Sequence, residues 1–307
     1  MLADANEMDR RIALATPPPA SAGVPGARAV VAALCVVAAL IVLRAPELLI
    51  EPRFSGEEGS VYFQAALDDG ALATLLTPHM DHLVLYENLA VLAAAWLVPI
   101  EHAPLVTTLA ALALQLVAPA IVLASRAPVW ASPWRRAAGV ALLLLVRPSA
   151  TVWLTTNTAA FHAAVIAFLL LLEPTAQPAR RAVDRAAIVA CGLTGPIASF
   201  LVPAYVHRAW HRRDRESAVQ AALLAACGLA QAAALLVART RPDGLHREVL
   251  VDAGTTGFAT VTRVVVQPVL GVPASAALAT WIDRVPDPAY QLAGVVLVGV
   301  LAAGLWR

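Results

Sequence analysis

A short acidic motif early in the chain holds the residues best suited to proton chemistry. Glu57 and Glu58 are adjacent and precede Gly59, which permits a tight turn or the close approach of a ligand. Neighbouring carboxylates repel each other, and partial burial beside a membrane strengthens this effect. A carboxylate in that setting can remove a proton from a substrate hydroxyl. The pair is therefore a candidate catalytic base, and a solvated acidic loop with no role is the alternative.

A second group of polar residues lies in the segment His79-Met80-Asp81-His82. Imidazole and carboxylate side chains at this spacing could bind a divalent metal or a ligand that carries phosphate. No second cluster completes the coordination, and Asp81 equally suits the start of a helix after Pro78. The sequence therefore leaves His79, Asp81 and His82 open between a metal site and a helix start.

Further candidates for binding a substrate are scattered along the chain. Arginines hold phosphate through charge-assisted hydrogen bonds, although each could instead mark a helix end at the headgroup layer or lie in a solvated loop. Asn157 could simply cap the helix that follows it. His162 stands alone on an apolar run, where a packed side chain is the alternative. With His82, these candidates are Arg147, Asn157, His162, Arg241 and Arg263.

The composition indicates what kind of scaffold must position these residues. Of the 307 residues, 60% are hydrophobic and 14% are charged, whereas a soluble domain carries about 25% charged residues. The apolar runs are continuous rather than alternating, so they favour membrane helices that satisfy their own backbone hydrogen bonds. We expect an all-α, polytopic transmembrane protein. The net charge of +1 does not indicate a nucleic-acid partner, and basic residues that are all arginine are typical of a GC-rich bacterial genome.

Apolar runs predict about seven to nine membrane segments, since a full span needs roughly 20 residues. Residues 1–28 are polar and rich in proline, which predicts a disordered cytoplasmic tail. Arginines before the first run place the N-terminus inside a bacterial inner membrane. The predicted transmembrane domain is 29–307, with outer loops over 51–82 and 239–288 and an amphipathic surface helix over 61–76. The runs lie at about 29–49, 83–100, 104–125, 137–146, 158–172, 186–206, 218–238 and 289–306.

The run over 186–206 decides the topology because Gly192-Leu193-Thr194-Gly195-Pro196 interrupts it. If 186–206 is one span, the arginines of 207–215 lie inside, but two earlier arginine pairs lie outside. If it is a hairpin, all of these clusters lie inside, and a second re-entrant segment, 83–100, is required. The hairpin version is favoured because it satisfies the positive-inside rule throughout. The two earlier pairs are Arg135/Arg136 and Arg180/Arg181.

Three stretches carry a resemblance to a known superfamily. Residues 53–62 hold an acidic pair before glycine, 157–162 place an asparagine before an apolar run, and 193–196 break a run ahead of a basic loop. In these motifs and their order, residues 29–215 resemble bacterial, especially actinobacterial, membrane glycosyltransferases of the GT-C superfamily. That group usually has Glu-Asp in the first loop. Here the second acid is Glu58, which reaches one methylene further.

The resemblance implies a GT-C-like fold and transfer of a hexosyl or pentosyl group from a polyprenyl-phosphate sugar to an outer-face acceptor of the cell envelope. It assigns the base to Glu58, with Glu57 beside it. The acceptor oxygen would attack the anomeric carbon with inversion, and arginines would stabilise the leaving phosphate. The implied partners are the donor lipid and the bilayer. A divalent metal and the oligomeric state are left open.

Two other functions remain compatible with the sequence. There is no P-loop, Rossmann glycine pattern, Gly-x-Ser-x-Gly or zinc-protease motif, which argues against a nucleotide-driven machine. Broken helices with polar residues at membrane level also suit a transporter or lipid flippase. A non-catalytic membrane scaffold is favoured if the two glutamates are dispensable.

Overall fold

Helices make up all of the regular structure among the residues described by the computed structural model, which are 25–145, 152–174 and 178–239. These residues all belong to Met1–His246, the first of two units into which the chain divides. The one β-bridge among them pairs His79 with His82. The all-α fold class is therefore confirmed for the described part of the chain. Ala- and Leu-rich runs favour this outcome because both residues are strong helix formers.

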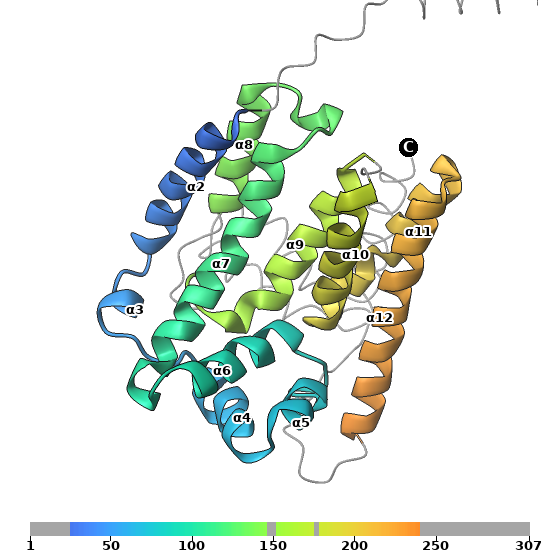
Figure 1. Ribbon diagram of the computed structural model, residues 1–307. Coiled ribbons are helices and arrows are strands. Elements are labelled where there is room, and N and C mark those ends of the chain that lie inside the picture. Colours follow the sequence, from blue (N-terminus) through green and yellow to red (C-terminus); the bar gives the residue numbers. More distant parts are fainter. Residues whose placement is uncertain (1–24, 146–151, 175–177, 240–307) are drawn as a thin grey trace, which may run out of the picture. The chain divides into compact units, whose positions relative to one another are not determined.

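The helix α7 (Ala103–Ala124) lies at the centre of the first half of the chain. It packs against α2 (Ala27–Val42), α6 (Leu85–Leu97), α8 (Pro133–Leu144) and α9 (Ala159–Leu172). Figure 1 shows α2 and α8 beside α7, with α9 leading toward the later helices. Three short 3₁₀ turns join these elements: η2 (Ile100–His102), η3 (Pro128–Trp130) and η4 (Thr156–Thr158).

The second half consists of α10 (Pro178–Leu193), η5 (Pro196–Leu201), α11 (Val202–Arg212) and α12 (Arg215–Arg239). Figure 1 shows α12 running beside α10 and α11, and it contacts both. The buried side chain of Gln231 in α12 donates hydrogen bonds to the carbonyls of Leu83 (3.2 Å) and Gly192 (3.1 Å). Such polar contacts between helices act as glue where the surroundings are apolar.

Among the described residues, two helices are long and apolar enough to cross a membrane, Ile100–Ala124 and Arg215–Ala238, and a bent pair raises this number to three at most. Shorter apolar helices take up the runs predicted near 29–49, 83–100 and 158–172. Large apolar side chains are nevertheless widely exposed, which indicates an environment of lipid rather than water. The described part is thus a helical protein suited to a bilayer with two or three candidate spans. The predicted run 289–306 lies outside it.

The bent pair corresponds to the run that the sequence left ambiguous. Arg180–Leu193 and Pro196–Arg212 meet at an angle of 118°. Gly195 at the bend has φ +121° and ψ 164°, a conformation that is essentially restricted to glycine. Pro196 follows and disfavours continuation of the preceding helix. The predicted break in this run is therefore present.

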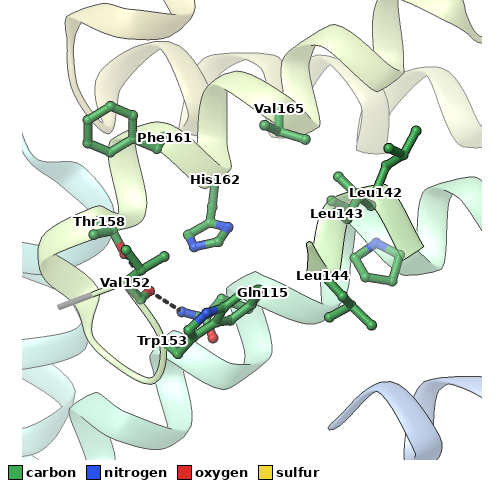
Figure 2. A pocket seen from close by; sticks show the side chains of 12 residues that line it. Gln115, Leu142, Leu143, Leu144, Val152, Trp153, Thr158, Phe161, His162 and Val165 are labelled. Atoms are coloured by element: carbon green, nitrogen blue, oxygen red, sulfur yellow. Dashed lines mark hydrogen bonds between the residues drawn. The ribbon is translucent and has the colours of Figure 1, made fainter. Parts of the chain in front are cut away.

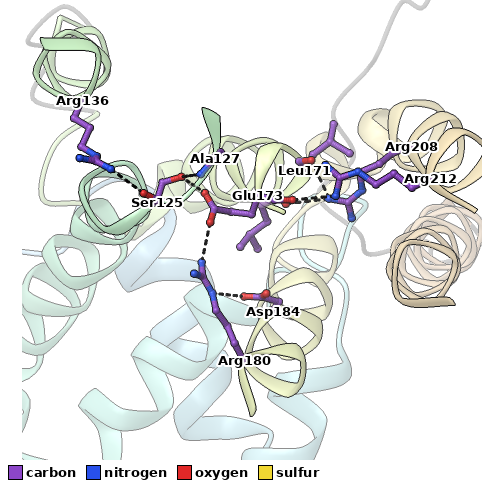
Figure 3. A network of polar contacts seen from close by, with 10 residues as sticks. Ser125, Ala127, Arg136, Leu171, Glu173, Arg180, Asp184, Arg208 and Arg212 are labelled. Atoms are coloured by element: carbon purple, nitrogen blue, oxygen red, sulfur yellow. Dashed lines mark hydrogen bonds and ion pairs between the residues drawn. The ribbon is translucent and has the colours of Figure 1, made fainter. Parts of the chain in front are cut away.

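Polar contacts join several helices at the C-terminal end of α9 (Figure 3). Glu173, the residue after α9, accepts a hydrogen bond from Ser125 and forms an ion pair with Arg180 (3.3 Å). Arg136 donates to the carbonyl of Ser125 (3.0 Å), and Arg212 donates to the carbonyl of Glu173 (3.3 Å). These contacts hold the end of α7 and the start of α8 against α10 and α11.

The network bears on the topology because its arginines come from different clusters of the sequence. Arg180 lies in the first turn of α10 and Arg212 at the end of α11, yet both bind Glu173. The chain between them therefore leads away from Glu173 and returns to it, as a hairpin does. Arg136 lies in the same network through Ser125. The contacts agree with the hairpin version, which groups these arginines on one side.

The predicted surface helix over 61–76 is divided in the structure. A π-helix, η1 (Glu58–Phe63), leads into α4 (Gln64–Asp68), and Gly70, with φ +78°, separates α4 from α5 (Ala71–Leu76). Buried side chains of η1 and α4 form a core cluster with α6. This stretch therefore packs on the protein and is not one helix lying on a membrane surface. The short α3 (Glu47–Ile50) precedes it.

Candidate functional site

Glu58 joins the first loop to a segment nearly 100 residues later. Its side chain is 2% exposed. The Oε1 atom accepts hydrogen bonds from Thr155 Oγ1 (3.0 Å), the Thr156 backbone N–H (2.5 Å) and Thr156 Oγ1 (2.7 Å). The Oε2 atom accepts one hydrogen bond, from the backbone N–H of Ser55 (2.9 Å). A buried carboxylate needs such partners, because an unpaired charge would be strongly unfavourable away from water.

Asn157 belongs to the same site. Its Nδ2 atom donates to the carbonyl of Ser55 (2.5 Å). The consecutive residues Thr156 and Asn157 therefore both hold the loop around Glu58. Asn157 does not cap the helix that follows it, which was the alternative role for this residue. Thr155 accepts from the backbone N–H of Asn157 and so caps η4, and α9 begins after Thr158 without a side-chain cap.

The loop that presents these donors is itself held by a helix. Gln115 of α7 donates to the carbonyl of Val152 (3.2 Å) and accepts from the backbone N–H of Leu154 (3.3 Å). Leu154 has φ +59°, which costs an L residue roughly 1–2 kcal/mol. This strained turn points the next two residues, Thr155 and Thr156, at the carboxylate. On the other side of the site, Glu58 is the first residue of the π-helix η1. π-Helical turns are rare in proteins overall, and those that occur are often found at functional sites.

Two more carboxylates lie in this region. Glu57 is half-buried in the same loop and precedes η1. Glu87 of α6 is buried, its Oε2 atom has no hydrogen-bond partner, and its carboxyl group interacts electrostatically with that of Glu58. The neighbouring Asn88 is also buried and donates to the carbonyl of Thr74 (2.6 Å). Ionisable groups buried in a membrane protein tend to mark functional sites.

Gly56→Ala is expected to disturb this site from the loop side. Gly56 has φ +54°, and a Cβ atom there would lie 2.8 Å from Nδ2 of Asn157. The new methyl group must displace the Asn157 side chain from the carbonyl of Ser55, so we expect a loss of about 1–3 kcal/mol in the free energy of unfolding. Chemical unfolding of the purified protein in detergent measures this change. Gly26→Ala is the control, because no atom lies within 4 Å of that position, and an equal effect of both changes would contradict the contact.

An apolar cavity of about 550 Å³ lies on the other side of the same loop (Figure 2). Its wall is formed by α7, α8, α9 and the loop, and includes Gln115, Leu142, Trp153, Thr158, Phe161 and His162. His162 lies in α9 with its ring centroid 6.2 Å from that of Trp153, and its buried Nε2 atom has no hydrogen-bond partner. Cavities of roughly 300–1,000 Å³ with few polar groups are typical of small-molecule sites.

His79 and His82 close a tight turn rather than start a helix. Their backbones exchange hydrogen bonds of 2.9 and 3.1 Å, and Met80 and Asp81 between them both have positive φ. Two such residues are the mark of a type I′ turn. The helix start expected near Asp81 is wrong, since α6 begins at Leu85. Across the described ranges, no group of three or more His, Cys, Asp or Glu side chains could hold a metal ion.

The structure thus brings together some of the predicted residues and separates others. Glu58 and Asn157 meet at one site, and His162 lies behind the same loop in the cavity wall. His82 lies in the turn before α6, where its Nδ1 atom is 2.7 Å from the carbonyl oxygen of Met80. Thr155 and Thr156 were not predicted as site residues, although two adjacent hydroxyl side chains directly before Asn157 were a signal of hydrogen-bond donors there. Arg147, Arg241 and Arg263 lie outside the described residues.

Comparisons of the chain with protein families, with curated proteins and with solved structures give no match. The functional argument therefore rests on the residues and their geometry.

Proposed function

We propose that this protein is a membrane glycosyltransferase that moves a sugar from a polyprenyl-phosphate donor to an acceptor hydroxyl. The observation that carries the proposal is the contact of Glu58 with Thr155 and Thr156. With the hydrogen bond from Asn157 to the carbonyl of Ser55, this contact joins residues 53–62 to the stretch that begins at Asn157, and these are two of the three stretches in which the sequence resembles GT-C enzymes. The third stretch, at Gly195-Pro196, forms the bend between α10 and η5.

In the proposed reaction, a first-loop carboxylate takes the proton of the acceptor hydroxyl. The acceptor oxygen forms a bond to the anomeric carbon, the bond from that carbon to the lipid-phosphate oxygen breaks with inversion, and the phosphate leaves with the electron pair. Oε1 of Glu58 accepts three hydrogen bonds and Oε2 only one, so Oε2 has capacity left for the proton. Because Glu58 is buried, the acceptor reaches Oε2 only when the Ser55 segment moves aside. Glu57, half-buried in the same loop, is the second candidate base.

The finer membrane arrangement is part of the proposal. The N-terminus lies in the cytoplasm of a bacterium, residues 51–82 face the outside of the inner membrane, and about seven to nine segments enter the bilayer. The Glu173 network supports this arrangement, because it gathers arginines that the positive-inside rule places in the cytoplasm. α9 separates that network from the Glu58 site by 14 residues, or about 21 Å of helix.

The proposal is tested by the activity of the purified full-length protein in proteoliposomes. Radiolabelled polyprenyl-phosphate sugars, hexosyl and pentosyl, are supplied with an extract of cell-envelope acceptors, and the label in the water-soluble or polymer fraction is measured. We expect the label to leave the donor lipid in a protein-dependent manner. Label that stays on the lipid with every donor, while the protein remains folded, would contradict sugar transfer.

A transporter or lipid flippase is the second candidate, and the bent pair α10–η5 favours it. Broken helices near polar residues are typical of substrate paths through membranes. The discriminating measurement is movement of a fluorescent polyprenyl phosphate between leaflets in the same proteoliposomes. Movement that persists after Glu57 and Glu58 are both replaced by glutamine, without any sugar transfer by the unmodified protein, would favour transport.

A further inference from the structure

The helix α11 has two faces, and one of them packs on the rest of the protein. On the packed face, Tyr205 is fully buried and donates a hydrogen bond to the carbonyl of Ala167 in α9 (2.7 Å). Arg208, three residues later, donates to the carbonyl of Leu171 at the end of α9 (2.9 Å), a contact that Figure 3 shows. These contacts fix which face of α11 points away from α9.

The other face of α11 carries a stripe of exposed apolar side chains. Val206 and Trp210 are 50% and 75% exposed, and Phe200, in the preceding η5, is 81% exposed. Side chains four residues apart lie on one face of a helix, so Val206 and Trp210 are neighbours. Exposed apolar patches mark surfaces that meet lipid or another protein. Tryptophan is enriched where a membrane meets water, because its ring is apolar and its N–H group is polar.

A sharp basic corner follows the stripe directly. α11 ends at Arg212 and α12 begins at Arg215, so Arg213 and Asp214 alone connect the two helices. Arg213 has φ 51° and ψ 27°, which is the left-handed conformation. The position after a helix that takes this conformation usually holds glycine, because any side chain there is strained. An arginine at this position indicates that its side chain has a use that outweighs the strain.

The arginines of this corner are available to a partner. Arg213 and Arg215 are exposed, and within the described ranges neither guanidinium group forms an ion pair or a hydrogen bond. The nearest carboxylates along the chain are already engaged. Asp214 accepts two hydrogen bonds in the first turn of α12, and Glu216 forms an ion pair with Arg185 (2.5 Å). Two positive charges therefore lie exposed at the end of the apolar stripe.

We propose that α11 and the corner after it bind an anionic phospholipid, with the phosphate on Arg213 and Arg215 and the acyl chains along Val206 and Trp210. Charge complementarity selects this partner, because guanidinium groups bind phosphate oxygens and basic residues attract anionic lipid. A free anion would leave the apolar stripe uncovered. An acidic protein would match the arginines, but a tryptophan beside them at the end of an apolar stripe favours a membrane interface. The inference does not rest on sugar transfer.

Binding of phosphatidylglycerol and of phosphatidylcholine with the same acyl chains tests the site in the purified full-length protein. Native mass spectrometry from detergent gives both dissociation constants, and we expect the unmodified protein to prefer phosphatidylglycerol. Each arginine near the lipid should contribute about fivefold, so Arg213→Gly combined with Arg215→Gln should weaken phosphatidylglycerol binding about twentyfold and leave phosphatidylcholine binding unchanged. Glycine at 213 relieves the strained conformation, so this variant should fold. Arg213→Lys combined with Arg215→Lys keeps both charges and should keep most of the preference.

A matched control and a second measurement separate the lipid from other partners. Arg53 is an exposed arginine of the first loop, so Arg53→Gln removes the same charge and should bind both lipids as the unmodified protein does. In proteoliposomes, the fluorescence that is lost in Trp210→Phe should be quenched by phospholipids brominated on their acyl chains. If those lipids do not quench it, protein covers the stripe, whether residues 240–307, a second copy or an acidic partner, and the proposal is wrong. An equal affinity of the unmodified protein for both lipids, or a preference that survives the loss of Arg213 and Arg215, would also contradict it.

Discussion

Glu58→Ala is expected to lower the free energy of unfolding by about 2–6 kcal/mol, since one buried and one partly buried backbone N–H group lose their acceptor at up to about 1–3 kcal/mol each. These groups belong to Ser55 and Thr156. The hydroxyls of Thr155 and Thr156 also lose their acceptor, but they can rotate toward others. Unfolding by denaturant in a mild detergent measures the change.

Glu58→Gln should be milder, with a loss of about 1–3 kcal/mol. Its amide oxygen can still accept the hydrogen bonds made to Oε1, whereas its NH₂ group would face the backbone N–H of Ser55. Glu57→Ala is the matched control in the same loop and should change stability by less than about 1 kcal/mol. If Glu58→Ala unfolds like Glu57→Ala, the hydrogen bonds of Glu58 do not hold the first loop.

Gly195→Ala is the second change with a large expected effect, about 2–6 kcal/mol of lost stability. The Gly195 backbone has φ +121°, and a Cβ atom there would lie 2.6 Å from Cβ of Ala160. The strain of this conformation contributes about 1–3 kcal/mol, and the overpacking contributes about as much again. The bend between α10 and η5 must then move away from the start of α9. The same unfolding measurement detects the loss.

Gly70 provides a control because its backbone also combines a positive φ with an extended ψ. Gly70 has φ 78° and ψ 166°, and Gly195 has φ 121° and ψ 164°. No atom lies within 4 Å of a Cβ atom added at Gly70. Gly70→Ala should therefore show the backbone strain alone. Ala160→Gly combined with Gly195→Ala should recover the overpacking part. Equal losses for Gly70→Ala and Gly195→Ala would contradict close packing of the bend on α9.

The sequence predicted much of the helical fold because apolar runs and helix breakers act locally. The runs near 104–125 and 218–238 became the two candidate spans, and Gly195-Pro196 became a bend. The division of 61–76 was missed, since apolar spacing does not show that Gly70 would take a positive φ. The turn at His79–His82 was missed for a similar reason, because Met80 gives no signal for the left-handed conformation that it takes beside Asp81.

The candidate site was harder to predict because its contacts are distant in sequence. Glu58 and Thr156 are 98 residues apart, and no spacing rule pairs a first-loop acid with a threonine after a later helix. The acid and Asn157 were singled out separately, from their residue types. Their meeting depends on the loop that Gln115 holds against α7.

Sugar transfer by Glu58→Gln, compared with Glu57→Gln, tests most directly whether the first-loop carboxylate is the base. Both variants are assayed with the donor lipid on which the unmodified protein is active, at a temperature where all three proteins are folded. General-base catalysis contributes roughly 10²–10⁴-fold, so Glu58→Gln should lose at least about a hundredfold in turnover while Glu57→Gln keeps most of it. Transfer by folded Glu58→Gln at the rate of the unmodified protein would contradict the role assigned to Glu58.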